Sequence, residues 1–338
     1  MSTDALKLER FAPDDPRMAE FEAVRTVAQP GLPTEPITGT PECLIARRGD
    51  DAIARCTVQV VEGLHGAPGR TGVIGHYETV DRAAGTWLLV RGREWLVEHH
   101  ARRVLGPMNG NTWARYRLAL PPKPGETEGP PFLGEPLNPP DYPAHFASAG
   151  FEIGARYESR IDLEPGSAPV DEALARAIGE RGISVRPLDP DRFDHELEEL
   201  FAMSLAAFAD NLYYTPIEFA AFRTQYERIR PILDPGFVLL AHDPQGALIA
   251  YQFAFPDPLS QEDGRATRAI VKTVATLPAA RGMGLANHML DLLRARAFAT
   301  GYRSVIHALM HIANASMKMS ARHRTEVFRR YALYTWSP

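Results

Sequence analysis

The stretch that decides the fold is Val271-Lys272-Thr273-Val274-Ala275-Thr276-Leu277-Pro278-Ala279-Ala280-Arg281-Gly282-Met283-Gly284-Leu285-Ala286. Its first part is rich in β-branched residues and predicts a strand that stops at Pro278. A glycine-rich turn follows, and apolar residues at helical spacing then predict a helix from Asn287 to Thr300. A strand, a small-residue turn and a helix N-terminus in this order form an anion site, because unpaired N–H groups and the positive end of the helix dipole meet there.

Arg281 places a cation beside this turn. The pattern differs from the dinucleotide fingerprint Gly-x-Gly-x-x-Gly and from a P-loop, which ends in Gly-Lys-Ser/Thr. Arg281-x-x-Gly284-x-Ala286 instead resembles the Arg/Gln-x-x-Gly-x-Gly/Ala signature of the GNAT family of N-acetyltransferases. In that family this loop binds the pyrophosphate of acetyl-CoA. The structural alternative is a plain strand-to-helix turn in which glycine supplies positive φ.

The elements around the loop agree with the resemblance. An amphipathic pattern predicts a helix over residues 192–210, and Thr215-Pro216-Ile217-Glu218 predicts the start of a second helix with Thr215 as its N-cap. This order of elements resembles the GNAT fold over residues 183–338. The remaining expected elements are strands over 236–242, 247–255 and 304–310, a short helix from Asn314, and a final strand over 327–336.

Residues 1–165 repeat this order of elements, although the residues themselves differ. The predicted fold class is therefore α/β, with two GNAT-like domains, each a mixed, mostly antiparallel central sheet flanked by helices. The second domain covers residues 183–338, and residues 166–182 form a linker helix. In the first domain the phosphate loop is expected at residues 82–87, before a helix over 88–103. Trp87 stands where a small residue is needed, so this copy is expected not to bind CoA.

Composition limits the function further. The chain has 338 residues and a formal net charge of −5. This charge argues against a nucleic-acid surface, and so against one possible function of paired GNAT-like domains, aminoacyl transfer from a charged tRNA. Cys43 and Cys56 are too few for a disulfide framework or a metal cluster, so we expect no metal and a reduced, cytoplasmic protein. No apolar run is long enough to span a membrane. The oligomeric state is not indicated.

The resemblance implies how acetyl-CoA, or another acyl-CoA, is held as co-substrate. Backbone groups of Val274, Ala275 and Thr276 on the loop-bearing strand would contact the cofactor and polarise its thioester carbonyl. Asn314 would either hydrogen-bond the pantetheine or cap the short helix, and the preference of asparagine for N-caps favours the cap. The implied pyrophosphate ligands are Arg281, Gly282, Met283, Gly284, Leu285 and Ala286.

Acyl transfer to an amine also needs a base for the amine and an acid for the leaving thiolate. The family often has a glutamate on the loop-bearing strand and a tyrosine on the last helix. This chain has no glutamate on that strand, and Ala321 stands at the tyrosine position. His311 and His307 are the predicted substitutes, because histidine has a pKa suited to base catalysis near neutrality. Tyr331 on the final strand is the predicted hydroxyl, with core packing as the alternative for each residue.

Tyr213 and Tyr214 lie at the break between the first two predicted helices and are expected to border the acceptor. One should line the pocket and the other pack outside, since neighbours on a regular element face different ways. The predicted function is N-acetyltransfer from CoA to an unidentified small-molecule amine or peptide. The missing glutamate and tyrosine favour the alternative, a catalytically inactive CoA-binding or small-molecule-sensing module. The Pro- and Gly-rich loop over 121–143 is expected to pack over a cleft or the other domain.

Overall fold

The computed structural model describes residues 5–32, 35–126, 128–166 and 169–338. We call the part up to residue 165 the N-terminal half and the part from residue 169 the C-terminal half. The N-terminal half contains β1 (Lys7–Phe11), α1 (Met18–Ala28), β2 (Glu42–Arg48), β3 (Asp51–Val61), β4 (Thr71–Thr79), α2 (Arg82–Glu98), β5 (Arg103–Gly106), β6 (Leu118–Ala119), α3 (Tyr142–Ser148) and β7 (Glu152–Asp162).

The C-terminal half repeats the alternation of strands and helices. It contains α4 (Glu172–Gly179), β8 (Ser184–Pro187), α5 (Phe193–Phe208), α6 (Phe219–Glu227), β9 (Val238–His242), β10 (Leu248–Pro256), β13 (Arg268–Thr276), α7 (Leu285–Ala299), β14 (Ser304–His311), α8 (Ala315–Ala321) and β15 (Glu326–Trp336). A small separate ladder pairs β11 (Gln261–Glu262) with β12 (Arg265–Ala266).

A single 13-stranded sheet runs through both halves in the order β1-β2-β3-β4-β5-β15-β7-β14-β13-β10-β9-β8, with β6 paired to β15. The parallel pairs are β4 with β5 and β13 with β14, and the other pairs between described strands are antiparallel. The predicted fold class, a mixed and mostly antiparallel sheet flanked by helices, is confirmed.

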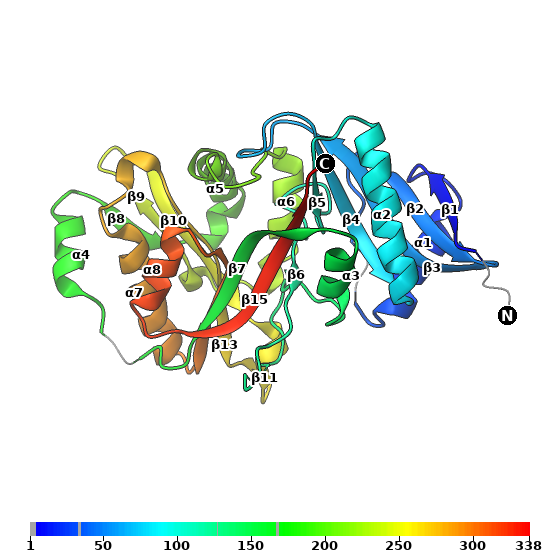
Figure 1. The fold of residues 1–338 in the computed structure, drawn as a ribbon. Coiled ribbons are helices and arrows are strands. Elements are labelled where there is room, and N and C mark those ends of the chain that lie inside the picture. Colours follow the sequence, from blue (N-terminus) through cyan, green and yellow to red (C-terminus); the bar gives the residue numbers. More distant parts are fainter. Residues whose placement is uncertain (1–4, 33–34, 127, 167–168) are drawn as a thin grey trace.

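The two halves exchange a strand. β15 pairs with β5 in the N-terminal half through Tyr334↔Gly106, and it pairs with β7 from Glu326↔Ile161 to Thr335↔Glu152. On its other edge β7 pairs with β14 of the C-terminal half. Figure 1 shows β7 in green and β15 in red side by side at the centre of the molecule. β15 of the C-terminal half thus joins the N-terminal sheet, and β7 of the N-terminal half joins the C-terminal sheet. The domain division between residues 165 and 183 stays a prediction.

Helices cover both faces of the C-terminal sheet. Phe253 and Ala254 are neighbours on β10 and therefore point to opposite faces. On the face of Phe253, α5 and α6 pack through residues such as Leu200 and Phe222. On the face of Ala254, α7 and α8 pack through residues such as Leu293. The site residues near the ends of β13 and β14 therefore lie between two helical layers.

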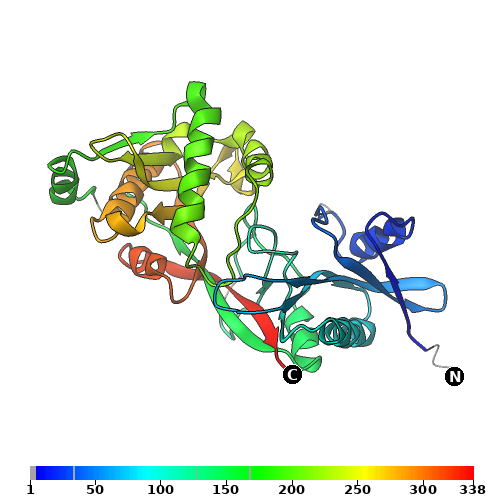
Figure 2. The same cartoon turned by 90° about the horizontal axis from the view of Figure 1, so that it is seen from above.

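The N-terminal half is built the same way. Leu44 and Ile45 point to opposite faces of β2, where α2 covers the face of Leu44 and α1, through Phe21, covers the face of Ile45. Seen from above, the two halves form two lobes joined along β7 and β15 (Figure 2). In the described part of the chain no helix has the length and apolar character needed to cross a membrane.

Two predicted helix starts are wrong. α2 begins at Arg82 and not at residue 88, because Asp81 caps it by accepting a hydrogen bond from the Ala84 N–H at 2.7 Å. Residues 82–87 are therefore helix and form no phosphate loop. α6 begins at Phe219, with Glu218 as N-cap, while the Thr215 carbonyl accepts a hydrogen bond from the distant Trp113 indole at 2.8 Å.

Candidate functional site

β13 and β14 part at one end. They are paired from Arg268↔Ser304 to Val271↔His307, although β13 continues to Thr276 and β14 to His311. Both strands are irregular where the pairing stops: Lys272 is an extra residue in the register with β10, and Leu309 has a φ of 57°. These irregularities lie where the β13–β14 pairing ends. Backbone groups on the facing edges of the two strand ends are thereby released from the β13–β14 ladder.

The turn after β13 has the geometry of an anion loop. Gly282 and Gly284 have φ values of 84° and 82°, which residues with a side chain rarely adopt. Gly284 is the N-cap of α7 and contributes no side chain to it. The first N–H groups of α7 therefore point out of the helix without an intrahelical acceptor. Arg281 is exposed beside them, and its guanidinium donates a long hydrogen bond to the Ala207 carbonyl at 3.5 Å.

The strand residues predicted to contact the cofactor lie on the same strand end. Val274, Ala275 and Thr276 pair on one side with Gln252, Tyr251 and Ala250 of β10. Their other edge faces the part of β14 with which β13 is not paired. The backbone of this strand end is therefore held rigidly on one side and is free on the other.

Asn314 lies at the N-cap position of α8, but its side chain makes no capping hydrogen bond. The expectation that it acts as a helix cap is therefore wrong. The residue is exposed. Its carboxamide is consequently available to a ligand that enters between β13 and β14.

The predicted histidines have separate environments. His307 is 1% exposed, and its Nδ1 lies 2.8 Å from the Ser320 hydroxyl. Burial lowers the pKa of His307 to about 3, so it stays neutral and does not exchange protons readily near neutrality. His311 is half-buried at the end of β14, edge-on to the Tyr157 ring, and its Nδ1 accepts a hydrogen bond from the Ala313 N–H at 3.2 Å. Burial also lowers the pKa of His311.

Tyr331 is fully buried and does not join the histidines. Its hydroxyl hydrogen-bonds Glu135 and lies 3.1 Å from the Ser159 hydroxyl. Ser159 in turn accepts a hydrogen bond from the Leu309 N–H on β14 at 3.0 Å. Glu135 also pairs with Arg329. The phenol is therefore part of a buried network that fixes β14 beyond the point where it leaves β13.

Glu135 comes from the Pro- and Gly-rich loop, and that loop packs on the C-terminal half. Phe132 lies in the core under α5 and α6, and the Leu133 N–H donates to Asp257 at 3.2 Å. The guanidinium of Arg268 donates to the carbonyl of Pro131 at 2.7 Å. Of the two expectations for this loop, packing over a cleft or on the other domain, these contacts favour the second. The role of Glu135 within it was missed, because a single glutamate in a long loop carries no recognisable sequence pattern.

Tyr213 and Tyr214 are both buried, so the prediction that one packs outside is wrong. Tyr213 has a φ of 62° between two helices, and the alternation of a regular element does not apply there. Its N–H donates to the His65 carbonyl at 2.8 Å, and the His65 N–H donates to the Tyr214 carbonyl at 3.2 Å. The ring of Tyr214 lies 5.9 Å from that of Trp113. Segments of the N-terminal half therefore enclose both tyrosines.

Lys272 is the residue that sequence reasoning missed. It follows Val271, the last residue of β13 that pairs with β14. Its ammonium lies 5.1 Å from the ring centre of Tyr226, on the face of the sheet covered by α5 and α6. The residue is exposed, yet loss of hydration around the ammonium lowers its pKa to about 8. The available signal was a lysine within the otherwise uncharged stretch of β13 that follows Arg268.

The corresponding position in the N-terminal half is already capped by a side chain. The Asp81 carboxylate occupies the N-terminus of α2, where an anion would otherwise bind. Trp87 is half-buried in the helix and packs against the N-terminal core.

Two parallel strands that part beside a strand–turn–helix unit are a feature of the GNAT fold. Residues 199–322 match the model of the acetyltransferase (GNAT) family. No curated protein matches the sequence.

Solved structures match the whole chain. A probable N-acyltransferase from Enterococcus faecalis V583 has a TM-score of 0.61 at 10% identity, over 98% of this chain and 73% of that one. A tandem GNAT protein from the clavulanic acid biosynthesis pathway has a TM-score of 0.53 at 15% identity, over 98% of both chains. The glucosamine N-acetyltransferase region of a fungal multi-domain β-N-acetylglucosaminidase has a TM-score of 0.57 at 14% identity, over 99% of this chain and 38% of that one. At identities this low, the structural matches show a shared fold alone.

Proposed function

We propose that the C-terminal half binds acetyl-CoA or another acyl-CoA and transfers the acyl group to an amine. The observation that carries this proposal is the parting of β13 from β14 directly before the Gly284-capped start of α7. A thioester between the strand ends would meet the free backbone edge of Val274 to Thr276. A preorganised N–H there would stabilise the oxyanion that forms during acyl transfer.

The turn would hold the pyrophosphate. Its glycines let the backbone approach closely, and the free N–H groups of α7 point outward to receive an anion. Within the described residues, the hydrogen bond that Arg281 donates to the Ala207 carbonyl is long, at 3.5 Å, and would compete little with a phosphate. Asn314 would contact the pantetheine from the α8 side, since its side chain is not used as a cap.

Lys272 supplies the base in this proposal. Its pKa of about 8 leaves a fraction of the amine neutral near neutrality. The acceptor nitrogen attacks the thioester carbon, its proton passes to the Lys272 nitrogen, and the carbon–sulfur bond breaks to release the thiolate. His311 is a second candidate, at the end of the neighbouring strand β14. His307 and Tyr331 are assigned structural roles, because each is buried and hydrogen-bonded within the core.

The N-terminal half is proposed to be a divergent GNAT-like domain that completes the acceptor side. The Trp113 indole reaches the carbonyl before α6, and the Arg117 guanidinium donates to the Leu309 carbonyl on β14 at 3.0 Å. The acceptor would therefore be a small-molecule amine or peptide that fits beneath these segments, and the predicted cytoplasmic location suits a supply of acyl-CoA.

Calorimetry with acetyl-CoA and its desulfo analogue, followed by thiol release with a panel of amines, tests the proposal. We expect one site per chain and turnover with at least one amine. Binding without turnover would favour the inactive CoA-binding module. Failure to bind either ligand would overturn the assignment of the loop.

A further inference from the structure

Leu309 is the residue at which β14 departs from a regular strand. It has a φ of 57°, in the left-handed region that residues with a side chain rarely adopt. β14 pairs with β7 on both sides of it, at His307↔Arg160 and at Met310↔Glu158, with a shift of register between these two pairs. Pairing with β13 ends at His307, directly before this shift. A conformation of this kind persists only where the surrounding groups hold it.

Two side chains hold the peptide groups of Leu309. Its N–H donates a hydrogen bond to the Ser159 hydroxyl, and its carbonyl accepts one from the Arg117 guanidinium, both at 3.0 Å. Ser159 belongs to β7, the strand that pairs with β14. Arg117 comes from the segment just before β6 in the N-terminal half. It therefore ties the irregular turn of β14 to a separate part of the fold.

The guanidinium of Arg117 is held in a fixed direction. Its central carbon lies 3.9 Å from the ring centre of Tyr116 and 4.3 Å from that of Tyr157. The residue is only 7% exposed. A hydrogen bond from a charged donor is stronger than one between neutral groups, and stacking on aromatic rings restricts the side chain further. Arg117 is therefore a rigid support for the Leu309 carbonyl.

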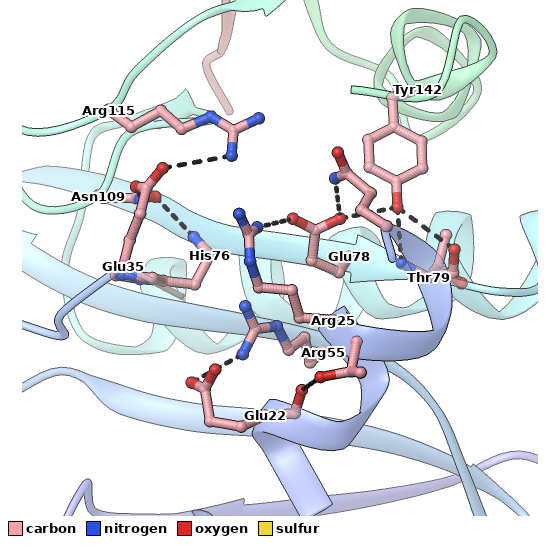
Figure 3. A network of polar contacts seen from close by, with 12 residues as sticks. Glu22, Arg25, Glu35, Arg55, His76, Glu78, Thr79, Asn109, Arg115 and Tyr142 are labelled. Atoms are coloured by element: carbon pink, nitrogen blue, oxygen red, sulfur yellow. Dashed lines mark hydrogen bonds and ion pairs between the residues drawn. The ribbon is translucent and has the colours of Figure 1, made fainter. Parts of the chain in front are cut away.

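The segment that carries Arg117 is itself anchored in the N-terminal half. It doubles back, with the Asn109 N–H donating to the Arg115 carbonyl at 2.9 Å. The Asn109 side chain accepts a hydrogen bond from the His76 N–H on β4 at 2.7 Å and donates to Glu35 at 2.6 Å. Figure 3 shows this group of residues, in which Arg115 reaches the same glutamate. These contacts connect the segment to the N-terminal sheet.

The same segment also contacts the helices that cover the C-terminal sheet. The Trp113 indole donates to the Thr215 carbonyl at 2.8 Å, and the Trp113 carbonyl accepts a hydrogen bond from Gln225 of α6 at 3.3 Å. The Trp113 ring lies 5.8 Å from that of Phe222. The segment is therefore fixed at both ends, in the N-terminal sheet and on α6, with Arg117 reaching β14.

We propose that Arg117 is a positioning residue for the acyl-CoA site, which from the N-terminal half holds Leu309 in its left-handed conformation and so keeps the end of β14 apart from β13. The inference rests on the proposed function, because the thioester would lie between these strand ends. Without the guanidinium, the turn at Leu309 loses one of its two supports. The strand end then fluctuates, and the open arrangement becomes one conformation among several. Acyl-CoA binding is weakened by the fraction of molecules that are not open.

Arg117→Met tests this role, because methionine keeps an apolar side chain between the rings and removes the charged donor. We expect acetyl-CoA affinity, measured by calorimetry, to fall at least about tenfold, the usual effect of losing a hydrogen bond from a charged group. Hydrogen exchange over residues 308–312, measured by mass spectrometry without ligand, should become faster. Arg93→Met is the matched control, because Arg93 donates to the Ala149 carbonyl at 2.6 Å and stacks on Trp336, away from β14. It should change neither measurement.

Two further variants separate positioning from general stability. Arg117→Lys keeps a charged donor but loses the planar group, so it should restore part of the affinity. Leu309→Gly, added to Arg117→Met, should also restore part of it, because glycine adopts a positive φ without support. Glycine removes packing, so it could not rescue a protein that is merely destabilised.

The inference is overturned if Arg117→Met binds acetyl-CoA as tightly as the wild type, or if its residues 308–312 exchange at the wild-type rate. Should Arg117→Met not fold, Arg117→Lys takes its place in both measurements, with the same two outcomes overturning the inference. A wild type that does not bind acetyl-CoA would instead contradict the proposed function. In that case the exchange rates alone decide whether Arg117 holds the end of β14.

Discussion

Leu174 of the linker helix α4 lies against Gly284 at the start of α7. A Cβ atom on Gly284 would come within 2.5 Å of the Leu174 Cδ1 atom. α4 is tied to the same region by an ion pair between Asp171 and Arg322 at 3.2 Å. The linker therefore packs directly against the turn that we assign to the pyrophosphate.

Gly284→Ala should reduce both stability and acetyl-CoA affinity. The φ of 82° disfavours any residue with a Cβ, at a cost of about 1–2 kcal/mol. The new methyl also clashes with Leu174. The double variant with Leu174→Ala should relieve the clash but keep the backbone cost, so its free energy of unfolding, measured in urea, should recover only in part. An alanine at 284 that binds acetyl-CoA like wild type would contradict the role of this turn.

Arg281→Glu should abolish acetyl-CoA binding, because it places a carboxylate against the pyrophosphate. Arg281→Gln should weaken binding about 10- to 100-fold, the usual effect of losing a hydrogen bond to a charged group. Calorimetry measures both affinities. Arg303→Gln, at an exposed arginine paired with Glu262, is the control. Equal acetyl-CoA affinities for wild type and Arg281→Glu would show that this loop does not bind the pyrophosphate.

Lys272→Met should lower the acyl-transfer rate about 10²- to 10⁴-fold while leaving acetyl-CoA affinity unchanged, as expected for loss of a general base. In the wild type the rate should rise with pH and level off above a pKa of about 8, because only the neutral amine accepts a proton. The variant should lose this rise. Lys318→Met, at an exposed lysine on α8, is the control. An unchanged pH profile in Lys272→Met would assign the base elsewhere, with His311 next to be tested.

Acid should destabilise the protein through its buried histidines. The pKa of His307 falls from 6.5 to about 3 on folding, so below pH 6.5 the unfolded chain binds a proton that the folded chain does not. Stability is complete above this value and falls with decreasing pH, by about 1.4 kcal/mol per pH unit for each such histidine.

His307→Asn should remove one histidine's share of this slope, measured by urea unfolding from neutral to mildly acidic pH. His76, whose pKa is also lowered to about 3, should retain its own share. His195→Asn, at an exposed histidine on α5, should leave the slope unchanged. A slope that His307→Asn does not alter would mean that this imidazole is already charged in the folded protein.

The strand exchange predicts that the halves stay together without a covalent link. A protease site inserted between residues 165 and 170 should allow cleavage, after which both fragments should elute as one species in size-exclusion chromatography. The contacts from Glu326↔Ile161 to Thr335↔Glu152 hold them together. Fragments that separate under native conditions would show that this pairing is not maintained in solution.

Local patterns made much of the C-terminal fold predictable. β13, its turn and α7 follow one another in the chain, and their residue types alone determine strand, left-handed turn and helix. The strand exchange was not predictable, because alternating residues specify that β7 and β15 are strands but not which partner each one takes. The start of α6 was missed because the Thr215 carbonyl accepts a hydrogen bond from Trp113, which is distant in the sequence.

The candidate site likewise contains residues that a local motif predicts and residues that only the fold brings together. Arg281 and Gly284 are visible in a six-residue motif, whereas the Glu135–Tyr331 contact joins residues 196 positions apart. Lys272 required knowledge of where the β13–β14 pairing stops. A polar pocket in the N-terminal half is lined by residues of α1, β3, β4 and the segments around β6, and no sequence motif predicts that these residues lie close together.

The central position of β15 constrains the order of folding during synthesis. β5 has its outer edge paired with residues up to Trp336, so the N-terminal lobe leaves that edge open until the last strand has emerged from the ribosome. An unpaired strand edge invites pairing with other chains. During synthesis, binding of a chaperone to the unfinished N-terminal lobe should reduce its aggregation. A chain terminated shortly before residue 326 should aggregate, because β5 keeps an unpaired edge.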